Sequence, residues 1–504
     1  MSSRRKFLKD SGMVAAGLGL SPLFTEELSS IKNSQNLAQQ AQQAQAAQTD
    51  YSGPEDSPNQ PFGTPKGIFP GRVVWVWNPD ATNKDCTNSF ETQDYWFKSE
   101  NTNKEVIREM LRSALPQLTG EATVKDSWDA MFKYFNKNKH NTNTGYKKGE
   151  KIFIKINQGT ARWVLSDEDK ANGYYYPKTI ASQSGRQPGG YGTTETTPGV
   201  ILEVLKQLVY DCGIAQEDIS VGDPMTNIYG HIFEVMYAEF PKVAYLDKWA
   251  VHHNRTLTKV TEENYLLYAN NQKDPLYDFI VKADYLINIA NLKPHLVASI
   301  SLLAKNHFGS HGQPTANHLH PYLITPRGIA GSNGGYKKYR VFVDLMGSKY
   351  LGRNTVINIV DGLFGGGSSE TSVPVKYYMP PFNNNWSNSI FVSLDQVALE
   401  SVGFDFLRTE WNGSHTHDSK NNRAEMYPNI RGVDDYIHQA ADRSNWPEGI
   451  IYDPDGSGTP LPSLGVHEHW NNPVDKQYSV NLGTGKGIEL VSIPETLVRS
   501  VNRT

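Results

Sequence analysis

The sequence has 504 residues, a formal net charge of −4 and two cysteines, Cys86 and Cys212. No block of basic residues stands out, which argues against nucleic acid as a partner. Two cysteines exclude an iron–sulfur cluster held by four cysteines of this chain and any cysteine-rich zinc finger. Their spacing leaves open whether they pair.

The first 30 residues, 1–30, have the order of an export signal. The basic run Ser3–Lys9 contains the pair Arg4 and Arg5, and a short apolar segment, Gly12–Phe24, follows it. That segment is too short to span a bilayer comfortably. The order resembles a twin-arginine signal, and the alternative is an ordinary basic N-terminus. The resemblance implies a periplasmic or exported protein that crosses the membrane already folded, with the twin-arginine translocation machinery as a partner.

Residues 31–67 are rich in Gln and Ala, and then in Pro, Ser and Asp. This composition cannot bury much apolar surface and predicts a low-complexity linker. No later segment is apolar enough to cross a membrane, so we expect no membrane span in the mature chain. Residues 68–150 form an N-terminal section with a strand in Gly71–Ala81 and a helix in Asn103–Gly120.

Residues 151–408 alternate strands with helices. The predicted strands are "KIFIKIN", "DISVGD", "ADYLINIANL", "NTVINIVDG" and "SIFVSLD", and the two clearest helices begin at Thr197 and Asp395. This alternation predicts an α/β fold with a largely parallel sheet flanked by helices. Residues 68–150 and 409–504 are expected to be less regular additions that pack on this core.

Polar residues follow the predicted strands, where open α/β sheets bind their ligands. We expect an anionic small molecule, a divalent metal, or both, to be bound there. The residues predicted to act in catalysis are Lys293, His295, Lys305, Asp223 and Asp361. Those predicted to bind a cofactor are Lys155, Asn157, Asn306, Gly365 and Gly366, and those predicted to hold a metal are Asp223, Asp361 and Asp395.

The stretch Leu286–Gly312 is the most unusual, because it is apolar yet contains lysines, histidines and Asn306. Buried lysines and histidines are costly unless something pairs them. We expect a helix to begin near His295 and to end at Gly309. Lys293 and His295 would then converge with Lys305, Asn306, Asp223 and Asp361 on one polar cavity. The alternative is that these groups only cap elements, make internal salt bridges or reach water.

Several of these segments resemble the domain of unknown function 362 family of bacteria and archaea. The matching pieces run in the family's order from about Lys151 to Arg408, and "NLKPH…AKNHFG" is the most specific of them. The resemblance implies no settled activity. Many relatives carry an added cysteine cluster that this sequence lacks, so no iron–sulfur cofactor is expected. An enzyme-like protein and a non-catalytic periplasmic binding protein both remain open.

The C-terminal section, 409–504, contains histidines in pairs, at His415 and His417 and at His467 and His469. A His-x-His pair on a strand points both rings to one face, which is a weak indication of a metal site. The segment Asp453–Gly456 resembles the start of a calcium loop but lacks the closing Glu, so a turn is expected there.

Overall fold

The residues that the computed structural model describes all belong to the unit Tyr51–Thr504. The described residues are 56–89, 92–161, 192–248, 254–295, 297–324, 336–367, 372–415, 417 and 433–498. The predicted export signal, and the predicted linker as far as residue 55, lie outside them.

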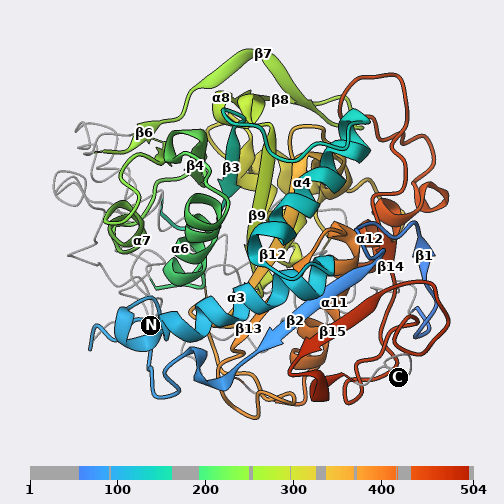
Figure 1. Cartoon of the computed structure of the whole chain (residues 1–504). Helices are drawn as coiled ribbons and strands as arrows, with labels where there is room; N and C mark the ends of the chain where they lie inside the picture. Colours follow the sequence, from blue (N-terminus) through green and yellow to red (C-terminus); the bar gives the residue numbers. More distant parts are fainter. Residues whose placement is uncertain are drawn as a thin grey trace, which may run out of the picture. The chain divides into compact units, whose positions relative to one another are not determined.

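A nine-stranded sheet forms the centre of the molecule, in the order β15-β2-β13-β12-β9-β3-β4-β5-β6 (Figure 1). In chain order these strands are β2 (Arg72–Trp77), β3 (Ile152–Lys155), β4 (Ile219–Gly222), β5 (Ala244–Asp247), β6 (Thr256–Leu257), β9 (Tyr285–Asn291), β12 (Thr355–Gly362), β13 (Ser389–Ser393) and β15 (Glu489–Ile493). In this described sheet only β13 runs antiparallel to both neighbours. The prediction of an α/β fold with a largely parallel sheet is confirmed.

Helices cover both faces of the sheet. The first face is covered by α3 (Lys104–Thr119), α4 (Val124–His140), α6 (Pro198–Lys206) and α7 (Gly230–Tyr237), and the second by α10 (Val341–Gly347), α11 (Gln396–Glu410) and α12 (Asp434–Ala441). Strand residues alternate between these layers: Ile152 and Ile154 pack with the first, and Phe153 with the second. Because side chains alternate along a strand, Lys155 points to the same side as Phe153.

The predicted helix boundaries follow from capping residues. Asn103 accepts a hydrogen bond from the amide of Val106 at the start of α3, and Gly120 ends that helix with a φ of 79°. Pro198 occupies the first turn of α6, where a missing N–H costs nothing. Asp395 caps α11 by accepting from the amides of Val397 and Ala398. A polar side chain at the first turn satisfies amides that have no partner within the helix.

The prediction of a helix from His295 to Gly309 is wrong. Pro294–His295 (β10) and Ser299–Ile300 (β11) pair as a short antiparallel ladder, and helix α9 covers only Leu303–Asn306. Nδ1 of His295 accepts from the amides of Val297 and Ala298, at 3.0 and 3.1 Å. Such a side-chain bond competes with helical hydrogen bonding, and Ser299, at a φ of 66°, cannot continue a helix.

The sheet extends beyond residues 151–408, because β2 and β15 come from the flanking sections. Smaller pairs are β1 (Phe62–Gly63) with β14 (Val466–His467), and β7 (Val260–Leu267) with β8 (Lys273–Tyr277); helix α8 (Asp278–Lys282) follows β8. The end of the predicted linker, 56–67, is bonded to later segments: the amide of Thr64 donates to Gly465 and that of Lys66 to Asp395.

Other sequence predictions concern the cysteines, the calcium-like loop and membrane spans. Cys86 and Cys212 are both free thiols. Asp453 accepts from the amides of Ser457 and Gly458, as in a turn, while Asp455 pairs with Arg353. Within the described ranges, no helix is both long enough and apolar enough to cross a membrane.

Candidate functional site

A pocket of about 120 Å³ lies at the carboxyl edge of the sheet, beyond the ends of β3, β4 and β9. Its lining includes six of the predicted site residues, namely Asn157, Asp223, Lys293, His295, Lys305 and Asn306. These residues come from segments far apart in the sequence, and the parallel strands bring them to one edge. The pocket is the candidate functional site.

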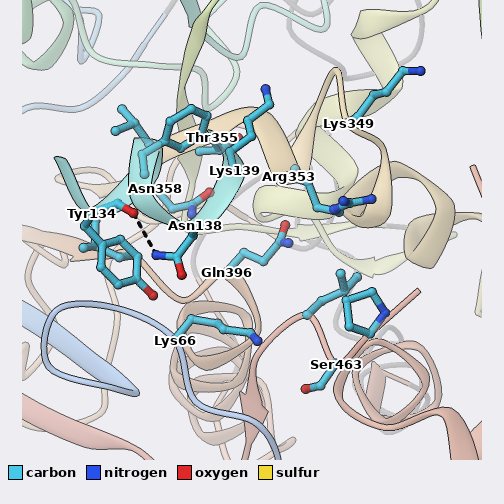
Figure 2. A pocket seen from close by; sticks show the side chains of 16 residues that line it. Lys66, Tyr134, Asn138, Lys139, Lys349, Arg353, Thr355, Asn358, Gln396 and Ser463 are labelled. Carbon is cyan, nitrogen blue, oxygen red and sulfur yellow. Dashed lines mark hydrogen bonds between the residues drawn. The ribbon is translucent and has the colours of Figure 1, made fainter. Parts of the chain in front are cut away.

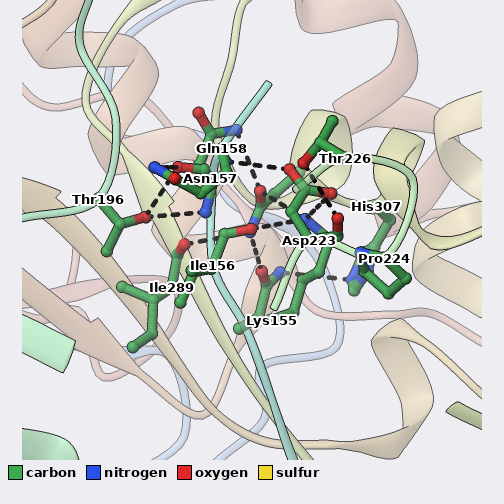
Figure 3. A network of polar contacts seen from close by, with 12 residues as sticks. Lys155, Ile156, Asn157, Gln158, Thr196, Asp223, Pro224, Thr226, Ile289 and His307 are labelled. Carbon is green, nitrogen blue, oxygen red and sulfur yellow. Dashed lines mark hydrogen bonds and ion pairs between the residues drawn. The ribbon is translucent and has the colours of Figure 1, made fainter. Parts of the chain in front are cut away.

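A buried ion pair lies behind this pocket: Asp223 is one of the lining residues, whereas Lys155, which is predicted to bind a cofactor, is not. Nζ of Lys155 lies 3.0 Å from Oδ1 of Asp223, and both side chains are almost fully buried. Burial lowers the pKa of Lys155, and the nearby Asp223 carboxylate partly opposes this effect. The other Asp223 oxygen, Oδ2, accepts from the amide of Gln158 at 3.0 Å (Figure 3). A side chain at position 309 would not fit here, since a Cβ on Gly309 would lie 1.8 Å from Oδ1 of Asp223.

Two asparagines connect this ion pair to Lys293. Oδ1 of Asn306 accepts from Lys155 at 3.2 Å and from Nδ2 of Asn157 at 3.1 Å. Nδ2 of Asn306 donates to Oδ1 of Asn288 at 2.8 Å, which fixes the orientation of the Asn306 amide. Asn157 in turn accepts from Nζ of Lys293 at 2.8 Å. The polar groups are therefore held in place by direct hydrogen bonds.

The glycine-rich loop after β12 positions Lys293. The amide of Gly366 donates to the carbonyl of Leu292 at 2.9 Å, and a Cβ on Gly366 would lie 2.1 Å from Cβ of Lys293. A Cβ on Gly365 would meet the Tyr377 ring at 2.5 Å. Both glycines thus allow close packing behind Lys293. They are not among the lining residues of the pocket, where we had expected them to bind a cofactor.

His295 and Lys305 complete the basic side of the pocket. Because Nδ1 of His295 accepts from two backbone amides, the ring proton of the neutral form is on Nε2. Nζ of Lys305 lies 4.1 Å above the centre of the Phe308 ring, an arrangement in which the aromatic face attracts the cation. Lys305 is half-buried, whereas Lys293 is buried.

Sequence reasoning missed Glu195, which also lines the pocket and is buried. Its Oε1 accepts from the amide and the hydroxyl of Thr160, and its Oε2 accepts from Gln158. Burial raises the pKa of Glu195 to about 7, against the opposing effect of the Thr160 hydrogen bonds and Lys293. Its signal in the sequence is slight: a single acid among threonines, two residues before the cap of α6.

Two predicted carboxylates do not line the pocket. Asn358 of β12 is in register with Asn288 and, through it, with Lys155. Asp361 is three residues further along β12, so its side chain points to the other face of the sheet. There it accepts from the amides of Thr197 at 2.7 Å and Leu363 at 3.1 Å. The expectation that Asp395 joins the other carboxylates is wrong. Since β13 is antiparallel, its last residue, Ser393, pairs with Asn358, so Asp395 lies toward the opposite edge of the sheet.

A second, larger pocket of about 330 Å³ lies at that opposite edge (Figure 2). Its charged lining residues are Lys66, Lys139, Lys349 and Arg353. Arg353 is paired with Asp455 at 2.8 Å, and Lys139 contacts Asn354. Open α/β sheets bind ligands beyond the carboxyl ends of their strands, and the charged groups of the carboxyl-edge pocket are more deeply buried. We therefore treat the carboxyl-edge pocket as the main site.

The fold and this pocket define an α/β protein with a buried polar site at the carboxyl edge of its sheet. Residues 187–405 match the family model described as domain of unknown function (DUF362). The match supports the family that the sequence resembles, over the region that contains Glu195, Asp223, Lys293 and Lys305. A search of curated proteins found no match.

Proposed function

We propose that this is an exported, enzyme-like protein that binds an anionic small molecule in the carboxyl-edge pocket. The observation that carries the proposal is the balance of charge around the pocket. Among the described residues that line it, Lys293 and Lys305 are cationic, and the negative charge of Asp223 is offset by its ion pair with Lys155. Glu195, with a pKa of about 7, is only partly ionised at neutral pH. Among the described groups of the pocket, positive charge therefore exceeds negative charge, which supports an anionic ligand.

Glu195 is the group best suited to transfer a proton to or from the bound anion. A catalytic acid or base works best when its pKa lies near the working pH, and a raised pKa in a pocket is a common feature of such groups. Lys293 and His295, which line the pocket, would orient the anion. The separation of Asp361 and Asp395 from Asp223 gives no support to a metal held by these three carboxylates in this pocket.

Lys305→Met tests the binding proposal. Methionine keeps much of the apolar side chain but removes the charge, so we expect anion affinity to fall about tenfold or more, as for loss of a charged hydrogen bond. The free energy of unfolding should change by less than about 1 kcal/mol, since Lys305 is only half-buried. Native mass spectrometry of the exported full chain identifies any co-purified anion. Calorimetric titration with inorganic phosphate and a panel of small carboxylates measures affinity.

Lys273→Met is the matched control, because Nζ of Lys273 also lies over an aromatic ring, at 4.3 Å from the centre of Tyr265, but outside the pocket. This control should bind like the unmodified protein. Equal losses in both variants would contradict the proposal. Loss of binding in Arg353→Met with retention in Lys305→Met would place the ligand at the opposite edge.

The alternative, a non-catalytic binding protein, differs in what happens to the ligand. A carrier releases its ligand unchanged, whereas an enzyme converts it, which nuclear magnetic resonance of the ligand can follow. Under our proposal Glu195→Gln binds the anion but no longer converts it. Release of unchanged ligand by the unmodified protein would support the carrier.

A further inference from the structure

A second cluster of ionisable side chains lies in the C-terminal section and is formed by Asp56, Asp434, His438 and His467. Asp434 and His438 share one face of α12 because they are four residues apart. His467 is on β14, where it pairs with Phe62 of β1, and Asp56 precedes β1. Elements distant in sequence thus bring two imidazoles and two carboxylates together.

The donor atoms of these four residues all lie within 4.8 Å of one another. Nε2 of His467 is 3.2 Å from Oδ2 of Asp56 and 3.7 Å from Oδ1 of Asp434. Nε2 of His438 contacts the same Asp56 oxygen. Donors of a tetrahedral zinc site, at about 2.0–2.1 Å from the metal, are roughly 3.3 Å apart. The spacing of the cluster therefore suits one small cation at its centre.

The hydrogen bonds around His467 supply an independent reason to expect a cation. Oγ of Ser401 lies 2.8 Å from the carbonyl oxygen of Val397, which has no hydrogen, so the hydroxyl donates there. The same Oγ lies 2.8 Å from Nδ1 of His467 and must accept from it. In the neutral ring, Nε2 then carries the lone pair, which faces the oxygens of Asp56 and Asp434. A buried lone pair that faces two carboxylates is repelled by them unless a proton or a metal ion lies between them.

The groups around the cluster have the arrangement expected behind metal ligands. Nδ1 of His438 lies 2.6 Å from the Tyr336 hydroxyl, as Nδ1 of His467 does from Ser401 at 2.8 Å. Hydrogen bonds to the second ring nitrogen usually orient ligating histidines. His469 lies 3.1 Å from Asp434 through Nε2 and 2.8 Å from Asp405 through Nδ1, so it holds the Asp434 carboxylate in place.

We propose that Asp56, Asp434, His438 and His467 bind one divalent transition-metal ion, with Zn²⁺ as the best match. Two neutral imidazoles and two carboxylates balance the charge of such an ion, and nitrogen with oxygen donors in a compact four-ligand set suits zinc. With four protein ligands the site is closed and structural. It fastens the chain at Asp56 to α12 and β14. The proposal is independent of the anion pocket.

Two other groups of candidate ligands lack this arrangement. Asp274, His311 and His318 offer a single carboxylate, whose Oδ2 already accepts from the Tyr268 hydroxyl and lies 2.8 Å from His318. His417, from the other His-x-His pair, is paired with Glu410 at 2.6 Å and is stacked on Trp411.

The test uses the full chain without an affinity tag, treated with a chelator and then titrated with Zn²⁺ or Co²⁺. We expect one equivalent of metal to bind and the melting temperature to rise. Bound Co²⁺ should show the intense visible absorption of a tetrahedral site. Asp56→Asn keeps the shape of a partly exposed side chain but removes its charge, so it should fold and bind at least tenfold more weakly.

His467→Gln should bind metal more weakly still, and Ser401→Ala should weaken binding about 10–100-fold through loss of the orienting hydrogen bond. His417→Gln is the control, because it removes a buried histidine outside the cluster and should leave metal binding unchanged. Unchanged affinity in Asp56→Asn, or no binding by the unmodified chain at micromolar Zn²⁺, would overturn the proposal. If the unmodified chain binds no Zn²⁺, protons between the histidines and Asp56, and not a metal ion, hold the cluster together.

Discussion

Glu195 gives the proposed anion site a pH dependence whose direction follows from its raised pKa of about 7. Below this pH the carboxyl group is neutral, and above it a negative charge develops beside the bound anion. We therefore expect affinity for the anion to fall as the pH rises through about 7. Titrations between about pH 5 and pH 9 measure this, and in Glu195→Gln the dependence should be nearly flat.

Two further observations check this assignment. Lys305→Met should weaken binding at every pH but keep the inflection near pH 7, because it leaves Glu195 in place. The same group also affects folding. Since the folded state holds the Glu195 proton more tightly than the unfolded chain does, its contribution to stability decreases as the pH rises from about 4.3 to about 7. A retained inflection in Glu195→Gln would mean that another group is responsible.

At the scale of residues, the sequence predicted much of the pocket because its charged groups stand next to buried strands. Lys155, Asp223 and Lys293 follow apolar runs, and the rule that parallel strands share a carboxyl edge places them together. Glu195 could not be found in this way, since it lies in a loop whose path depends on Thr160 and Gln158. Asp361 also follows an apolar run, but its side chain points to the strand face that bonds to Thr197 and not into the pocket.

At the scale of elements, Asp395 has a structural role that can be measured. It accepts from the amides of Val397 and Ala398 at the start of α11, and also from those of Lys66 and Val466. Asp395→Ala leaves buried amides without partners, so we expect the free energy of unfolding to fall by roughly 2 kcal/mol or more. Denaturant unfolding measures this loss.

Asn103→Ala is a matched control, because Asn103 caps α3 with one longer bond of 3.3 Å in an exposed position. Its loss should cost about 1 kcal/mol or less. Neither variant should change anion affinity. If Asp395→Ala lost more anion affinity than its loss of stability explains, Asp395 would belong to the binding site.

The elements were predictable wherever periodicity and capping agreed. Helices α3 and α11 and strands β3, β4, β9 and β12 match the expected segments. The structure of the segment after β9 was not predictable, because its apolar spacing resembles that of a helix. His295 and Ser299 instead stabilise a hairpin-like pair of strands. The antiparallel direction of β13 was not predictable either, because the residue pattern of a strand is the same whether the strand runs parallel or antiparallel to its neighbours.

At the scale of the whole molecule, the pair Arg4 and Arg5 lies outside the described residues, and its role stays a prediction. Replacing both with Lys keeps the charge and should leave the protein in the cytoplasm, because the twin-arginine route reads the arginine pair itself. Fractionation of cells followed by immunoblotting measures the distribution. Replacing Lys6 and Lys9 with Arg provides a control that should still be exported, and normal export of the double Lys variant would contradict the prediction.

The position of β2 between β13 and β15 has a consequence for how the chain is made. Both neighbours of β2 lie far downstream, so its apolar sequence "RVVWVW" has no strand partner when it leaves the ribosome. Synthesis from Trp77 to Ser389 takes roughly 15–60 s at ~5–20 residues per second. Unpaired apolar strands promote aggregation during such a delay. The nascent chain should therefore depend on a chaperone until its last hundred or so residues arrive. The proposed twin-arginine export, which carries folded proteins, would then have to wait until β2 is paired on both sides.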